Sequence, residues 1–330
     1  MNLITMGIFI SIILGSDVEE IVKSKKPYIA PDDTLKHLDF TDYFLKLMKD
    51  YSDCYMHPSS TLLPFLNHYD LINPFVRIKK NRKVFLDFLE EIVAASTDKE
   101  SILYQISHLD QFEHETVMHD LIGLFGASAE TSSHTMTSAL YFLKKNPEVL
   151  KKLKAEIETH FKEFPEDVDA YSKDNILKLD YLNNVVKETL RNDSPAMESL
   201  RYKASEDISI CGVDISKGSE LVVDICGSHY NSDEWIEPFS FIPERFDPTS
   251  KYFLKPNSDR PRNPYAYSPF SHGSRSCPGQ TLAMLEIKVM LVSLLRKIDY
   301  SIDKEMLDRD DVGFGIATDT PLYFTLTAKN

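Results

Sequence analysis

Cysteine is scarce in this chain of 330 residues, and no two cysteines form a Cys-x-x-Cys pair. The four lie far apart in the sequence, at Cys54, Cys211, Cys226 and Cys277. This spacing argues against a zinc site and against a disulfide framework, both of which need clustered or regularly spaced cysteines. The pattern is typical of a protein in a reducing, intracellular compartment.

Basic residues and long apolar runs are also lacking. Lys and Arg number 37 against 51 Asp and Glu, for a formal net charge of −14, which argues against nucleic acid as a general partner. The apolar stretch at residues 1–15 is shorter than a membrane span and has neither a basic start nor a clear cleavage site of small residues. We therefore favour a buried helix there over a signal peptide. No later stretch is long and apolar enough to cross a bilayer.

The chain does contain enough apolar residues for a full core, and they recur with helical periodicity. Hydrophobic residues make up 42% and charged residues 27%, as in globular proteins. Helical spacing is found in residues 40–53, 81–96, 113–146, 147–161, 179–195 and 281–298. Residues 199–225 instead alternate apolar and polar side chains, which predicts short antiparallel strands, and residues 311–330 predict a final hairpin. The predicted fold class is mainly α with a small antiparallel β-sheet.

The stretch FSHGSRSCPG at 270–279 puts Cys277 in a tight bend directly before the last predicted helix. A helix N-terminus carries partial positive charge and unpaired N–H groups, and Arg275 adds a full charge. Both favour the thiolate form of the cysteine, which is the form that binds iron. Gly273 and Gly279 let the backbone approach a flat ligand, and Phe270 can shield the sulfur from water. The alternative is an ordinary loop cysteine ahead of a helix.

This stretch resembles the cysteine-ligand loop of the cytochrome P450 family, the haem-thiolate monooxygenases. The family pattern Phe-x-x-Gly-x-Arg-x-Cys-x-Gly is met at all five fixed positions. The resemblance implies that Cys277 is the axial ligand of the iron in haem b (iron protoporphyrin IX). It also implies that the remaining motif residues contact the cofactor, namely Phe270, Gly273, Arg275 and Gly279.

A run of small residues, GASAETS at 126–132, lies inside the long helical pattern of residues 113–146. Such a run lets a flat cofactor press against a helix, and it allows a kink or bulge to open. Glu130 can take part in a proton relay and Thr131 can hold bound oxygen or water. A close-packed helix crossing explains the same residues equally well when they are considered alone.

Beside the cysteine loop, this run resembles the oxygen-activation segment of the same family, Ala/Gly-Gly-x-Asp/Glu-Thr. The matching residues are Ala127, Ala129, Glu130 and Thr131. Ser128 replaces the usual glycine, a departure that alters the capacity of the helix to kink. The resemblance implies that Glu130 and Thr131 are the catalytic residues.

Glu188 and Arg191 are three residues apart on a predicted helix and can pair on one face. The pair is either an exposed one of little consequence or a buried one that needs a further partner, such as Arg245 in the PERF stretch at 243–246. Glu-x-x-Arg followed by Pro-x-Arg-Phe resembles the structural triad of the family. We interpret these three residues as scaffold for the cysteine loop and not as catalysts.

The resemblance also implies residues that contact the cofactor or the substrate outside these motifs. An arginine in the position of Arg201 meets a haem propionate in the family, and the residues before it, 195–200, line the substrate pocket. Gly315–Thr318 match the last substrate-contacting turn.

The family motifs occur in family order and cover residues 113–330. The resemblance therefore implies one cytochrome P450-like domain over 1–330 that is truncated on its N-terminal side, because only about 110 residues precede the oxygen-activation helix. In the family, a longer front segment supplies early strands, a membrane anchor in microsomal members, and a helix whose Trp and Arg hold the haem. Here the single tryptophan, Trp235, lies far downstream. We expect the opposite wall of the haem pocket to be incomplete.

The implied activity is monooxygenation of a small apolar organic substrate, with electrons from a reductase. The implied location is the endoplasmic reticulum membrane surface, with peripheral membrane contact. One alternative is a haem-thiolate isomerase or dehydratase, which needs no electrons; retention of Glu130 and Thr131 argues against it. The other is an inactive or non-enzymatic haem-binding fragment, which the short front segment favours.

Overall fold

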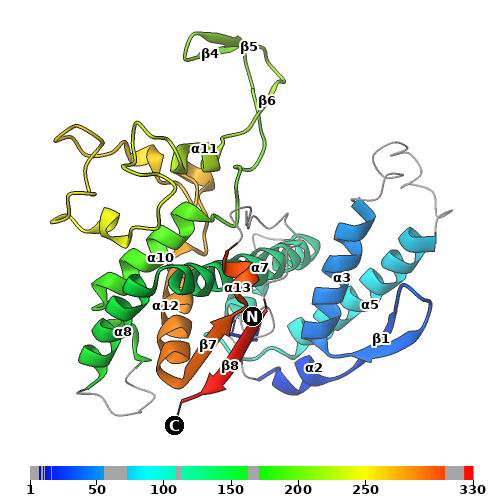
Figure 1. Cartoon of the computed structure of the whole chain (residues 1–330). Coiled ribbons are helices and arrows are strands. Elements are labelled where there is room, and N and C mark those ends of the chain that lie inside the picture. The colour runs from blue at the N-terminus through cyan, green and yellow to red at the C-terminus, as the bar shows by residue number, and fades with distance from the viewer. Residues whose placement is uncertain are drawn as a thin grey trace. The chain divides into compact units, whose positions relative to one another are not determined.

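The computed structural model describes residues 7–8, 10, 12–15, 17–55, 73–108, 113–162, 171–308 and 323–329 (Figure 1). Within them the chain is mainly helical, and its strands form four two-stranded antiparallel sheets, which confirms the predicted fold class. The chain divides into two compact units, Asn2–Glu130 and Thr131–Asn330, called here the N-terminal and C-terminal units. The single domain expected over residues 1–330 stays a prediction.

The N-terminal unit is built on aromatic packing between helices. It contains α2 (Glu19–Lys23), β1 (Lys26–Ile29), β2 (Leu35–Leu38), α3 (Phe40–Tyr55), α5 (Asn73–Ala95) and α6 (Ile102–Ser107). Phe40 on α3 packs against Phe85 and Phe125 with ring centroids 5.1 and 5.3 Å apart. These rings are buried, as the helical spacing of the sequence predicts. Both predicted helices are confirmed, and α5 begins eight residues before its predicted start at 81.

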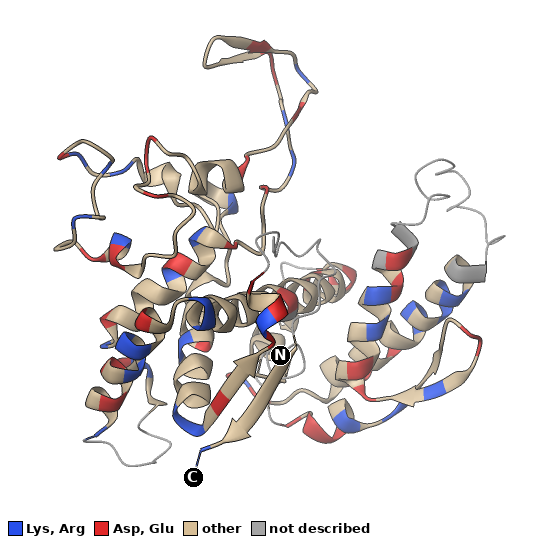
Figure 2. Cartoon of the chain, viewed as in Figure 1, with Lys and Arg blue, Asp and Glu red and all other residues tan. Residues whose placement is uncertain are grey.

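Helix α7 (His114–Lys145) passes from the N-terminal into the C-terminal unit, and its limits confirm the prediction. The next helix, α8 (Pro147–Phe161), begins at the predicted position. Asn146 is its N-cap residue and Pro147 its first helical residue, a position that suits proline because the missing N–H has no helical partner there. Acidic and basic residues are interspersed along the exposed side of α8 (Figure 2).

The C-terminal unit contains further helices. They are α9 (Lys173–Ile176), α10 (Asp180–Asn192), α11 (Ile225–His229), α12 (Gln280–Lys297) and α13 (Lys304–Leu307). Three short 3-10 helices lie between α11 and α12: η3 (Pro243–Phe246), η4 (Pro264–Ala266) and η5 (Gly273–Arg275). Helix α10 packs against α8, α12 and η3. This packing places the predicted Glu-x-x-Arg helix beside the PERF stretch.

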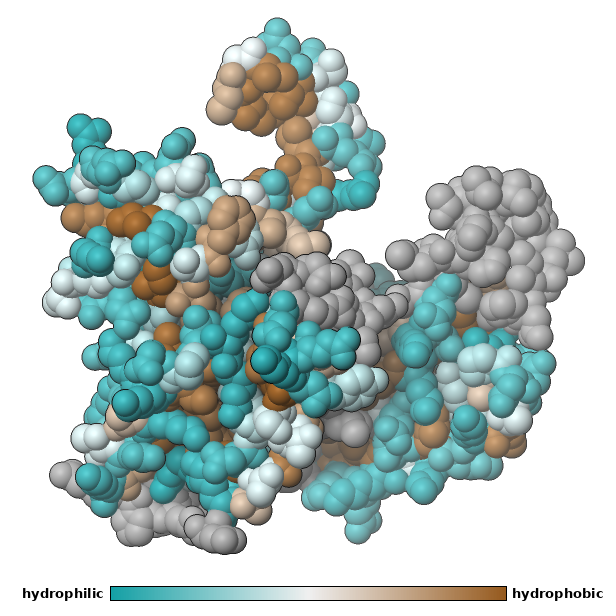
Figure 3. All heavy atoms as spheres, viewed as in Figure 1, coloured by the Kyte–Doolittle hydropathy of each residue, from teal (hydrophilic) through white to brown (hydrophobic). Residues whose placement is uncertain are grey.

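The predicted strands of residues 199–225 are confirmed as two hairpin-like pairs. β3 (Tyr202–Lys203) pairs with β6 (Glu220–Leu221), and β4 (Ile208–Ile210) pairs with β5 (Val213–Ile215). The two residues between β4 and β5, Cys211 and Gly212, both have positive φ, as a tight hairpin turn requires. The β4–β5 hairpin exposes Ile210 and Val213, which belong to the apolar surface visible at its tip in Figure 3.

The hairpin predicted within residues 311–330 stays a prediction, because only residues 323–329 of this tail are described. Among the described strands, β8 (Phe324–Ala328) pairs with β7 (Ile298–Ile302), which follows α12 directly (Figure 1). The register pairs Tyr300 with Leu326 and leaves Tyr300 buried against the core. Residues 309–322, including Gly315–Thr318, lie outside the described residues.

Among the described residues, no helix has both the length and the apolar content that crossing a membrane requires. In the opening segment, the described residues Ile10, Ile13 and Leu14 are buried, in agreement with the predicted buried helix. Gly15 has a φ of +86° and separates these residues from α2.

Candidate functional site

The Cys277 loop is closed by its own backbone. The Cys277 N–H donates to the Phe270 carbonyl over 2.9 Å, and the Ser276 N–H donates to the Gly273 carbonyl over 3.1 Å. Gly273 has a φ of +76°, a conformation that side-chain-bearing residues rarely adopt. The motif therefore forms one tight bend, as its sequence predicts.

The sulfur of Cys277 stands at the start of α12. Gly279 is the N-cap residue of this helix, and a Cβ added there would lie 3.8 Å from Cys277 Sγ. Cys277 is a free cysteine; it and Arg275 are exposed, while Phe270 is half-buried. The bend thus presents an accessible thiol at the N-terminus of α12, and Arg275 lies two residues before it in the sequence.

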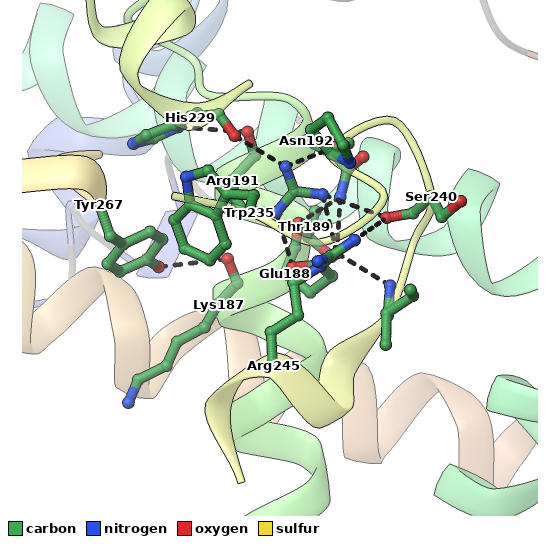
Figure 4. A network of polar contacts seen from close by, with 12 residues as sticks. Lys187, Glu188, Thr189, Arg191, Asn192, His229, Trp235, Ser240, Arg245 and Tyr267 are labelled. Carbon is green, nitrogen blue, oxygen red and sulfur yellow. Dashed lines mark hydrogen bonds and ion pairs between the residues drawn. The ribbon is translucent and has the colours of Figure 1, made fainter. Parts of the chain in front are cut away.

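Glu188, Arg191 and Arg245 form a fully buried triad, which decides between the exposed and the buried pair (Figure 4). Arg191 makes two parallel hydrogen bonds of 2.9 Å to the Glu188 carboxylate. Arg245 Nε donates to Glu188 Oε1 over 3.1 Å. All three side chains are 0% exposed.

One carboxylate faces two guanidinium groups in this triad, so backbone carbonyls complete the polar contacts. Arg191 donates to the carbonyls of His229 and Pro238 over 2.8 and 2.7 Å. Arg245 donates to the carbonyl of Glu237 over 2.6 Å, and burial lowers the pKa of its guanidinium. The triad thereby attaches the irregular chain before η3 to α10, which supports the interpretation that it is a scaffold.

Helix α7 is an uninterrupted α-helix through residues 126–132, so the bulge that its small residues allow is not formed. The Ser128 hydroxyl donates to the Phe125 carbonyl over 3.2 Å, inside the helix. Glu130 is exposed and Thr131 is half-buried. The unit boundary falls between them, with Thr131 in the same unit as Cys277.

Glu286 is a residue of interest that the sequence analysis missed. It lies on α12, nine residues after Cys277, and its Oε2 accepts a hydrogen bond of 3.2 Å from the buried Ser132 hydroxyl on α7. Burial raises the pKa of Glu286 to about 6, and its Oε1 has no hydrogen-bond partner within the part of the chain that the structure describes. The contact therefore joins Ser132 on α7, the residue after Thr131, to α12, the helix that follows Cys277. In the sequence, the one indication of this residue is that Glu286 is an isolated carboxylate in the apolar helical pattern of residues 281–298.

We expect Glu286→Gln to stabilise the protein above pH 6. The folded-state pKa is raised from 4.5 to about 6, so the stability that the neutral acid contributes is complete below pH 4.5 and is lost as the pH rises through 6. A glutamine stays neutral and can still accept from Ser132, so about 2 kcal/mol should be recovered at pH 7.5. Denaturant unfolding at pH 4.5, 6 and 7.5 measures this, with the exposed Glu130→Gln as control. A Glu286→Gln protein less stable than the parent at pH 7.5 contradicts the prediction.

The residues predicted to meet the propionate and the substrate are exposed for the most part. Arg201 forms an ion pair of 3.0 Å with Glu220, across the β3–β6 pair. Met197 and Leu200, within the predicted pocket segment, are 42% and 66% exposed. Their roles stay predictions.

A family model described as cytochrome P450 matches residues 2–326 of the chain. The chain belongs to the cytochrome P450 family. The resemblance inferred from residues 113–330 therefore extends across the weakly assigned front part as well.

Individual relatives and solved structures agree with this membership. The chain is 27% identical over 310 residues to cytochrome P450 3A2 of Rattus norvegicus, covering 91% of this chain and 58% of that protein. It is 34% identical over 229 residues to cytochrome P450 3A6 of Oryctolagus cuniculus, covering 69% of this chain and 42% of that protein. The crystal structure of the cytochrome P450DA heme domain matches with a TM-score of 0.75 at 19% identity, covering 100% of this chain and 67% of that one. The chain thus spans about half the length of the curated P450 relatives it matches.

Proposed function

We propose that this P450 chain is a haem-thiolate monooxygenase that inserts one atom of O2 into a small apolar organic substrate. The observation that supports it most is the accessible Cys277 thiol in a closed bend at the N-terminus of α12. Family membership adds the expectation of haem, and haem b is the form we propose.

The residues of the bend fit a flat, anionic macrocycle. The thiol is exposed, and a Cβ added to Gly273 would meet no atom of the described residues within 4 Å. The Phe270 carbonyl accepts from the Cys277 N–H within the bend, and we propose that the Phe270 ring shields the sulfur from water. Arg275 and Arg201 are exposed cations that we propose as partners of the propionates.

When bound, haem supplies the activation of O2, and the chain supplies the ligand, the pocket and the protons. In our proposal Cys277 binds as thiolate, which donates electron density. The Thr131 hydroxyl holds a water by a hydrogen bond and passes a proton to it. The exposed Glu130 carboxylate exchanges protons with solvent. Residues 195–200 provide apolar contacts to the substrate.

Thr131→Ala should uncouple electron consumption from product formation, because the hydroxyl that directs protons is lost. We expect product per reductant to fall about tenfold or more, with peroxide released instead. Peroxide and product are measured per reductant consumed. The control is Thr137→Ala, on the same helix, where the hydroxyl donates to the Ser133 carbonyl over 2.8 Å. An unchanged ratio in an active Thr131→Ala protein would count against the role.

The monooxygenase proposal is tested with isotopically labelled O2, an electron-donating reductase and a panel of apolar compounds. One labelled atom in the product supports it. A product formed without O2 and without reductant instead supports the isomerase or dehydratase alternative. Haem binding with no turnover of any compound supports the non-enzymatic fragment. Location at the endoplasmic reticulum surface is likewise a proposal, carried by the family resemblance.

A further inference from the structure

We propose that His229 is a positioning residue that fastens the Cys277 loop to the Glu188–Arg191 network. The inference rests on the proposed function only in taking the loop as the ligand-bearing element. The hydrogen bonds that carry it belong to the chain itself, and no family motif identified above includes this histidine.

His229 is the last residue of α11 and is 0% exposed. Its Nε2 accepts a hydrogen bond of 2.9 Å from the Ser268 N–H, and its Nδ1 lies 3.2 Å from the Arg191 carbonyl. A backbone N–H can only donate, so Nε2 is the unprotonated nitrogen. The ring proton therefore lies on Nδ1 and is donated to the Arg191 carbonyl. One tautomer of one side chain therefore bridges α10 and the chain that leads into the loop. Figure 4 shows His229 beside Arg191 of α10.

Ser268 passes this connection on to the loop. Its hydroxyl donates its one proton to the Tyr265 carbonyl over 2.9 Å, so the oxygen accepts from His272 Nε2–H, also at 2.9 Å. His272 is the N-cap residue of η5, the turn directly before Cys277. Only four residues, 269–272, lie between Ser268 and η5, and the last of them is hydrogen-bonded to Ser268.

The residues around His229 keep its ring neutral, with the proton on Nδ1. The Tyr267 ring stacks on it with centroids 5.5 Å apart. Burial and the nearby Arg191 charge lower the pKa of His229 to about 4, so the ring is neutral and remains an acceptor at neutral pH. Arg191 also donates to the His229 carbonyl over 2.8 Å, which fixes the end of α11.

Hydrogen–deuterium exchange of the full chain without haem tests the link. In His229→Leu, which is close in size but can neither accept nor donate, the amides of Ser268 and Cys277 should exchange about tenfold faster. Amides of buried α12 residues 287–295 should change less than about twofold. His229→Gln, which offers both an acceptor and a donor, should restore much of the protection. Tyr267→Phe is the matched control, because it removes the 3.2 Å bond to the Lys187 carbonyl and keeps the stacked ring.

Unchanged loop exchange in a folded His229→Leu protein overturns the proposal, and so does equal acceleration in the loop and in α12. Should that variant not fold, nitrogen NMR of the parent decides: the proposal requires the Nδ1–H tautomer of His229, and the Nε2–H tautomer overturns it. In haem-loaded protein, His229→Leu should also increase the share of reduced, CO-bound haem that has lost its thiolate. A parent that binds no haem refutes the proposed function but leaves the exchange result to decide this inference.

Discussion

Cys277→Ser is expected to abolish thiolate ligation of the haem iron completely. Among the described residues, the other free cysteines are placed differently. Cys211 occupies the turn between β4 and β5, and Cys226 is half-buried in α11, where burial raises the pKa of its thiol. Neither precedes a long helix whose N-terminus favours an anion, so neither can replace Cys277.

The measurement is the paramagnetic resonance spectrum of the ferric haem-loaded protein, in which thiolate ligation gives a low-spin signal of its own. Cys211→Ser and Cys226→Ser are the matched controls and should keep the parent signal. A Cys277→Ser protein that still shows the thiolate signal would refute the assignment of the ligand.

Glu188→Ala should cost roughly 3–5 kcal/mol, because Arg191 and Arg245 would remain fully buried without their carboxylate. That is a large share of the 5–15 kcal/mol or so by which a domain is stable. Carbonyl contacts alone cannot balance two buried cations. The expected outcome is misfolded protein that holds no haem, and not a folded enzyme with a slow chemical step.

Thermal unfolding, with haem content measured alongside, separates these outcomes. The control is Glu220→Ala, which breaks the exposed Arg201–Glu220 pair, whose side chains are 75% and 64% exposed, and should cost about 1 kcal/mol or less. A Glu188→Ala protein that binds haem normally and melts within about 2 °C of the parent would remove the basis for the scaffold role.

Local patterns in the sequence predicted the helices and the turn that depend on interactions between residues close in the chain. The long helix α7 and the start of α8 follow from apolar periodicity and from the Asn146-Pro147 boundary. The Cys277 bend follows from the spacing of its motif. The triad was predictable as a pairing, since Glu188 and Arg191 share a helix face, but its burial came only with the packing of α10 against η3.

The remaining features depend on contacts between distant parts of the chain. The partner of β8 is β7, and alternation within a strand does not say which strand lies beside it. The contact of Glu286 with Ser132 spans 154 residues, and those of His229 with Arg191 and Ser268 span 38 and 39. A shifted pKa follows from such burial and not from residue type, so neither residue stood out in the sequence.

The central claim is that this chain, which spans about half the length of its curated P450 relatives, binds haem through the Cys277 thiolate. The most direct test is the carbon monoxide difference spectrum of the reduced, haem-loaded protein, because it reports haem binding and thiolate ligation together. The account predicts the absorption band of CO-bound, thiolate-ligated haem in the parent chain. A spectrum with no haem band, or with the band of haem that lacks a thiolate ligand, would contradict it.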